Sequence, residues 1–234
     1  MTMTPPTEST AIVETRLAHD VHRAASTLLA EAALNPSVPL SALAQLRDFL
    51  VSNLDHHHES EDNDLWPRIV AAVPAAALEL DSLSEEHERL DAALNQLAAV
   101  AMNGNGAGGN LSETAKPTAD QGGTSATTVR AALHAAAVTV RDRVHDHLAH
   151  EEPVLFPALR DHLTPAEWED FSQRVIATTP PVAGHLMVGF LDEVGTPAEV
   201  DLVLSGLPEP VRPLVPGLRL RAAADLGILR GIGA

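Results

Sequence analysis

The chain has 234 residues, of which 45% are hydrophobic, and this is enough for one packed domain with an extension. Its formal net charge of −17 at pH 7 argues against nucleic acid and against anionic membranes as partners, because both require a basic surface. The absence of cysteine excludes disulfides, thiolate metal sites and cysteine nucleophiles.

The N-terminal stretch MTMTPPTEST has neither a basic nor an apolar signal region, and no apolar run reaches the roughly 18 residues that span a bilayer. We therefore expect a soluble cytoplasmic protein.

The first predicted helix runs from about Thr10 to Ala33, and Asn35-Pro36 ends it because proline disfavours a helical residue before it. The second helix begins near Ser41 and enters the stretch HHHESEDNDLWP at residues 56–67.

A capping-box pattern, Ser82-Leu83-Ser84-Glu85, marks a third helix. Residues 103–125, rich in Gly, Thr and Ser, predict a flexible surface loop. A fourth helix is expected from about Thr127 into His150-Glu151, and a shorter fifth helix from Thr164-Pro165. Frequent prolines after residue 180 predict only short helices and turns.

The predicted fold is all-α. We expect an antiparallel up-down four-helix bundle with a short extra helix and an irregular, Pro-rich C-terminal tail. The bundle is assigned to residues 10–178 and the C-terminal extension to residues 179–234.

The histidine-rich stretch of the second helix recurs 90 residues later in the fourth helix. Chance gives such a second copy with a probability on the order of 10⁻⁵ to 10⁻⁴, so the repeat is not accidental. The matched pairs are His57 with His147, Glu61 with Glu151, Asp62 with Glu152, Leu65 with Leu155, Trp66 with Phe156 and Pro67 with Pro157.

His-x-x-x-Glu places both side chains on one helix face, and an imidazole beside a carboxylate makes a half-site for a transition metal. A further histidine precedes each copy. His87 precedes the second copy, and either His22 or His19 precedes the first. We prefer His22, because it shares with His87 a leucine seven residues later.

Four imidazoles and two carboxylates converging in a bundle core suit two metal ions. Without a metal, burying six titratable groups would be very costly. The candidate ligands are His22 or His19, His57, Glu61, His87, His147 and Glu151.

Two His-x-x-x-Glu helices, each closing in Leu-aromatic-Pro and each preceded by a single-histidine helix, resemble the hemerythrin-like (HHE cation-binding) family over roughly residues 10 to 165. The resemblance implies a bundle holding a non-haem di-iron centre, bridged by the two carboxylates and by solvent, with an open position for dioxygen or a related oxidant. One departure is visible. Oxygen-carrying members have a second histidine one turn from the third-helix histidine, whereas Leu83 and Asp91 flank His87. The candidates to replace it are Asp91, His150 and the His19/His22 pair.

Other polar residues near the repeat have simpler interpretations. His56, His58 and Glu59 point to other faces than His57 and are expected at the surface, and His134 is expected to be structural. The acidic run Glu59 to Asp64, apart from Glu61, is expected to be solvated. Trp66 and Phe156 are expected to cap the core.

These residues favour a di-iron protein that binds or senses dioxygen, peroxide or nitric oxide. One alternative is a di-iron enzyme that decomposes hydrogen peroxide. Another is a metal-dependent regulatory or interaction module, suggested by the apolar segment Leu202 to Leu220. Zinc or manganese would fit the same ligands, since imidazole and carboxylate donors do not select a metal by affinity alone. The sequence does not identify a protein partner.

Overall fold

The computed structural model describes residues 8–102 and 119–232, of which 119–125 are described as backbone only. Within these ranges the regular structure is entirely helical, which confirms the predicted all-α class. The elements are α1 (Thr10–Leu34), α2 (Leu40–Ser60), the π-helical turn η1 (Glu61–Leu65), α3 (Trp66–Ala72), η2 (Pro74–Ala76), α4 (Ala77–Ala98), α5 (Ala119–His162), α6 (Pro165–Thr178), α7 (Gly184–Val194), α8 (Pro197–Ser205), η3 (Arg212–Leu214) and α9 (Val215–Leu229).

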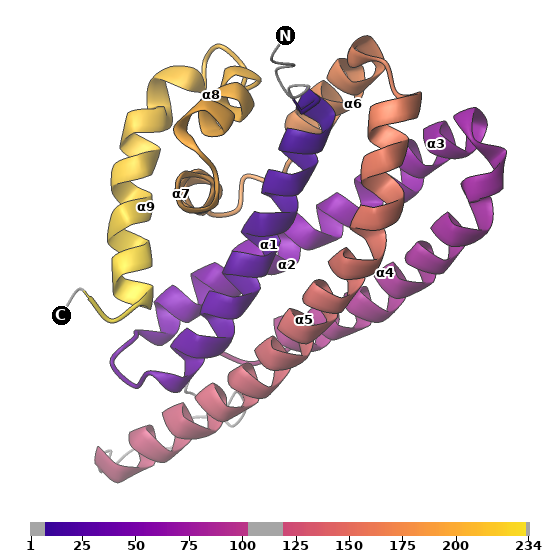
Figure 1. Cartoon of the computed structure of the whole chain (residues 1–234). Helices are drawn as coiled ribbons and strands as arrows, with labels where there is room; N and C mark the ends of the chain where they lie inside the picture. The colour runs from indigo at the N-terminus through magenta and orange to yellow at the C-terminus, as the bar shows by residue number, and fades with distance from the viewer. Residues whose placement is uncertain (1–7, 103–118, 233–234) are drawn as a thin grey trace, which may run out of the picture.

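Four long helices, α1, α2, α4 and α5, surround the main hydrophobic core (Figure 1). Helix α1 packs along α5 and α2, and α4 packs along the same two helices from the other side. Leu17, Phe49, Leu94 and Val140, one from each helix, are completely or almost completely buried in this core. Each of these four helices carries at least one candidate metal ligand.

Two predicted boundaries need correction. Helix α5 begins at Ala119, so the last part of the expected loop 103–125 is helical, while residues 103–118 lie outside the described residues. The Ser82–Glu85 pattern does not start a helix, because α4 begins at Ala77. Ser84 instead donates its hydroxyl to Asp62 at 2.6 Å, a tertiary partner that a local capping rule does not anticipate.

The C-terminal tail is helical rather than irregular. Pro197 and Pro216 lie in the first turns of α8 and α9, where a missing backbone N–H breaks no helical hydrogen bond. Helix α7 packs against α9 and α1, so the tail covers one side of the bundle (Figure 1). A Cβ at Gly189 would lie 2.6 Å from that of Ala222, so the close approach of α7 and α9 requires glycine there.

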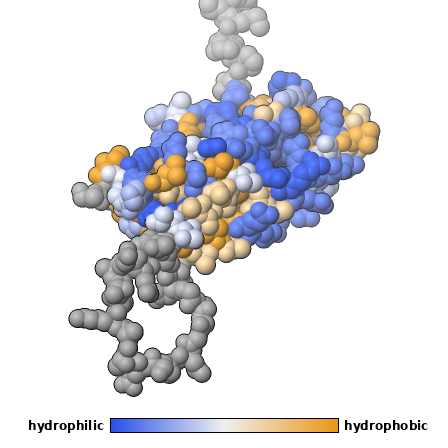
Figure 2. Space-filling model, turned by 90° about the horizontal axis from the view of Figure 1, so that it is seen from below, coloured by the Kyte–Doolittle hydropathy of each residue, from blue (hydrophilic) through white to orange (hydrophobic). Residues whose placement is uncertain are grey.

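The exterior is mostly polar. Figure 2 shows one face on which hydrophilic side chains predominate and apolar side chains form separate patches. None of the helices in the described ranges has the length and apolar content needed to cross a bilayer.

Candidate metal centre

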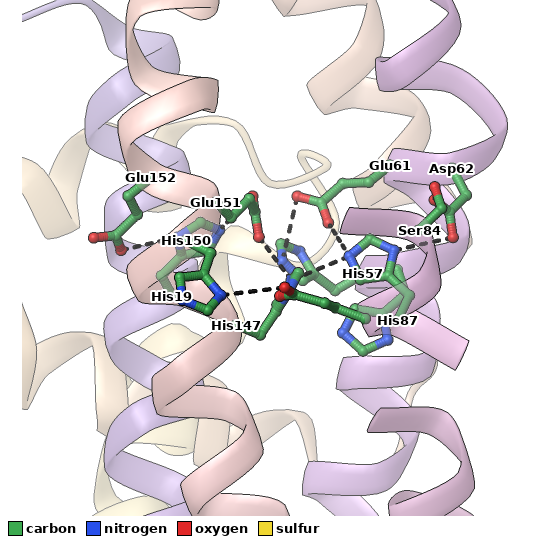
Figure 3. A network of polar contacts seen from close by, with 12 residues as sticks. His19, His57, Glu61, Asp62, Ser84, His87, His147, His150, Glu151 and Glu152 are labelled. Carbon is green, nitrogen blue, oxygen red and sulfur yellow. Dashed lines mark hydrogen bonds and ion pairs between the residues drawn. The ribbon is translucent and has the colours of Figure 1, made fainter. Parts of the chain in front are cut away.

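The candidate ligands meet inside the bundle as two neighbouring groups. The first group is His58, His87 and His147, and the second is His19, His57, Glu61 and Glu151. In each group, one ligand atom per residue lies within 4.8 Å of the others. Figure 3 shows Glu61 and Glu151 directed toward the space between helices from both halves of the chain.

The first group brings three imidazoles from three helices into contact. The Nε2 atoms of His87 and His147 lie 3.1 Å apart, and the His58 ring stacks on His87 with centroids 4.3 Å apart. His58 is only 2% exposed, so its expected surface position is wrong. The face of α2 that points into the bundle includes both His57 and His58. The sequence prediction assumed a narrower face that includes only His57.

The third imidazole of the first group is His58, which was not among the predicted replacements for the missing histidine. Asp91 does not join the group; it accepts a hydrogen bond from Nδ1 of His58 at 2.7 Å. The side chain of His150 is 66% exposed and contacts Glu86, so it does not face the site. Among the described residues, the histidine that lies beside His87 and His147 thus comes from α2.

The two carboxylates of the second group also approach the histidines of the first group. Glu61 places Oε1 3.4 Å from Nε2 of His57 and Oε2 3.6 Å from Nε2 of His87. Glu151 places Oε1 3.5 Å from Nε2 of His19 and Oε2 2.9 Å from Nε2 of His147. Each carboxylate thus presents one oxygen to a histidine of each group.

The two histidines of α1 take different positions. His19 belongs to the second group, whereas His22 lies beside it, with its ring centroid 4.8 Å from that of His57. This grouping favours His19, the reverse of the sequence preference. The side chains of His19 and His22 are both buried. The leucine seven residues after His22 therefore does not show which of the two points toward the ligand group.

Carboxylates outside the site orient four of the imidazoles. A carboxylate can only accept from the ring, so Nδ1 carries a proton and Nε2 faces inward, where the neutral ring has the lone pair that binds a metal. Metal-binding histidines are commonly oriented in this way. The pairs are His19 with Glu152 at 3.1 Å, His58 with Asp91 at 2.7 Å, His87 with Asp62 at 3.0 Å and His147 with Glu86 at 3.1 Å. Asp62, expected to be solvated, is therefore part of the site's support.

Buried polar atoms without hydrogen-bond partners converge where a cation would be bound. Such an atom costs roughly 1–3 kcal/mol when left unsatisfied, so several in one place indicate a missing ligand. The atoms are Nε2 of His19, His57 and His58, Nδ1 of His22, Oε2 of Glu61 and both side-chain oxygens of Glu151. These nitrogen and oxygen donors fit transition metals.

The protonation of the site also fits cation binding. Burial lowers the pKa of His57 well below its usual value and that of His22 to about 3, so both imidazoles are neutral. Burial and the charge of Glu151 raise the pKa of Glu61. Burial opposes ionisation of Glu151 as well, but His19 and His147 outweigh it and lower the pKa of Glu151 to about 2. A cation would therefore displace a proton from the carboxylate pair.

Residues 11–116 match the family described as the hemerythrin HHE cation binding domain. This segment, which makes up less than half of the chain, is similar to that domain. This confirms the resemblance found in the sequence over residues 11–116. The matched segment contains α1 to α4, whereas His147 and Glu151 lie beyond it on α5. No curated protein and no solved structure matches the chain.

The aromatic residues of the internal repeat also lie beside the site. The ring of Trp66 stacks near His87 with centroids 6.2 Å apart, and Phe156 stacks near His19 at 6.1 Å. The matched aromatic residues thus wall the site as well as close the core. The π-helical turn Glu61–Leu65 holds one of the carboxylates, and such turns are frequent at functional sites.

One side of the site opens into a small cavity of about 160 Å³. His22, His57 and Glu61 line it on the bundle side, and Trp168 and Phe171 of α6 close it opposite. Drug-sized ligands occupy pockets of roughly 300–1,000 Å³, so this space admits only a small molecule beside the metal ligands.

Proposed function

We propose that the protein is an antiparallel up-down four-helix bundle that holds two iron ions and binds or senses dioxygen or a related small oxidant such as peroxide or nitric oxide. The observation that carries this proposal is the placement of Glu61 and Glu151, each with one oxygen toward each histidine group. Bound iron would supply the redox and oxidant-binding chemistry that the side chains lack. Zinc and manganese are the alternatives that suit the same donors.

The side chains of this protein have separate roles in the proposal. His19 and His57 would hold one ion, and His58, His87 and His147 the other, while the two glutamates serve both. Asp62, Glu86, Asp91 and Glu152 keep the Nδ1 protons away from the site. Burial of the ligands limits contact with bulk water, and the small cavity offers space for a molecule of diatomic or peroxide size beside them.

A second candidate function, peroxide decomposition, is favoured by Glu14. This carboxyl lines the same small cavity and accepts hydrogen bonds from Trp168 at 2.7 Å and Ser172 at 3.1 Å. Burial raises the pKa of Glu14 despite these bonds. A carboxyl with a raised pKa near the site suits proton delivery in a small oxidation. A cytoplasmic location and the absence of nucleic-acid and membrane partners stay predictions.

Metal analysis of protein made in iron-replete cells tests the proposal. We expect close to two irons per chain in the wild type, and loss of both in Glu61→Ala and Glu151→Ala. Glu59→Ala is the matched control, because Glu59 is exposed on the same helix as His57. A folded, metal-free protein that takes up no iron during anaerobic loading would refute the proposal. Catalytic rather than stoichiometric consumption of hydrogen peroxide would establish the second candidate.

A further inference from the structure

A large chamber lies between the bundle and the C-terminal helices. Its volume is about 1500 Å³, above the usual range for small-molecule pockets. Helices α1 and α2 form one wall, and α7, α8, η3 and α9 form the other. Apolar side chains predominate in its lining, among them Leu40, Met187, Val188, Leu204, Leu207 and Leu218.

The chamber adjoins the small cavity of the metal centre. Six residues line both spaces: Glu14, Ala18, Asn53, Ile176, Thr179 and Met187. The small cavity is lined in turn by His22, His57 and Glu61. A molecule seated in the chamber would therefore have one end next to the metal ligands.

The charges of the lining disfavour an anionic occupant. Glu14 and Asp48 are acids, and Arg221 is the one Arg or Lys among the lining residues of the described part of the chain. Its guanidinium lies 3.8 Å from Asp225. His185, also in the lining, contacts the same carboxylate at 2.8 Å. A carboxylate or phosphate headgroup would thus meet no unpaired cation in the described lining. A neutral apolar molecule has no charge to desolvate, so its entry would cost little free energy.

We propose that this chamber binds a neutral, largely apolar organic molecule whose end reaches the small cavity beside the metal ligands. Binding itself does not depend on a metal. The role of the bound molecule as a substrate or signal for the centre rests on the proposed function. The C-terminal helices would then complete the ligand site that the bundle alone leaves open.

Fluorescence titration of metal-free, full-length protein with Nile red, a neutral apolar dye, tests binding independently of iron. We expect saturable one-to-one binding and displacement by 1-dodecanol at concentrations at which dodecanoate displaces less. Ala44→Trp, which places an indole in the chamber, should weaken dye binding at least tenfold. Ala42→Trp is the control, because Ala42 has similar burial on the same helix but does not line the chamber.

A second pair of variants covers the case in which Ala44→Trp does not fold. Leu214 is 59% exposed and lines the chamber, whereas Leu220 is 77% exposed and does not. Leu214→Asn should weaken binding severalfold, and Leu220→Asn should leave it unchanged. Absence of saturable binding, equal effects within a matched pair, or stronger displacement by dodecanoate would overturn the proposal.

A separate experiment tests whether the molecule bound in the chamber reaches the small cavity. Trp168 lines that cavity but not the chamber, and the sequence has only one other tryptophan, Trp66. In metal-free Trp66→Phe protein, 12-bromo-1-dodecanol should quench Trp168 fluorescence, and Ala18→Phe at the junction should reduce that quenching. If the brominated alcohol displaces the dye but does not quench Trp168, the proposal that the bound molecule reaches the small cavity is wrong. Iron content, measured separately, would show whether the proposed function fails on its own.

Discussion

Replacing Glu61 with leucine should make the metal-free protein more stable while it abolishes metal binding. Glu61 is 2% exposed, and its Oε2 has no hydrogen-bond partner. Burial and Glu151 raise its pKa, so ionisation of this carboxyl disfavours the metal-free fold. Removing one unsatisfied buried oxygen should stabilise the fold by about 1–3 kcal/mol. At about 2–4 °C per kcal/mol for a chain of this size, the melting temperature should rise by about 2–12 °C.

The assay compares calorimetric melting of chelator-treated proteins with metal content after anaerobic loading. Glu59→Leu is the matched control, because Glu59 is exposed and its replacement should change stability by no more than about 0.5 kcal/mol. Two results would refute the reasoning. One is a metal-free Glu61→Leu protein that melts below the wild type. The other is a variant that still binds two ions per chain.

Three further predictions concern the ligands and their support. His58→Leu should reduce the metal content from two ions to one, whereas His56→Leu, outside both groups, should keep two; equal metal content in the two variants would remove His58 from the site. Metal-free protein should lose stability as the pH falls from 6.5 toward 3, because the pKa of buried His22 is about 3 and the unfolded chain binds the proton first. The loss should reach at most about 5 kcal/mol by urea unfolding and should shrink in His22→Leu; an unchanged pH slope in that variant would contradict this assignment. Asp62→Asn, which weakens the support of His87, should lower metal affinity about 10–100-fold in chelator competition without changing the fold, and unaltered affinity would count against that role.

The repeated motif could be found in the sequence because it depends only on the spacing of residues within one helix. An α-helix places residues four apart on one face whatever surrounds it, so the pairing of His57 with Glu61 and of His147 with Glu151 follows from spacing alone. The cost of burying such pairs without a cation then indicates a metal. The same local rules predicted an all-helical chain.

Only the packing of the helices decided which side chains point toward the core. Local spacing does not fix how far each helix is rotated about its axis, so it assigned His58 to the surface, although the side chain is buried. It also could not show that packing brings His19 of α1 into the ligand group. The support of His87 by Asp62 joins α4 to η1, and such a contact exists only when the two segments are packed together. The tail shows the same limit, because prolines mark where helices start, and tertiary contacts such as that of Gly189 with Ala222 determine whether they persist. The sequence by itself determined which chemical groups share a helical turn. The tertiary structure decided which of those turns face one another, because that depends on the packing of all four helices at once.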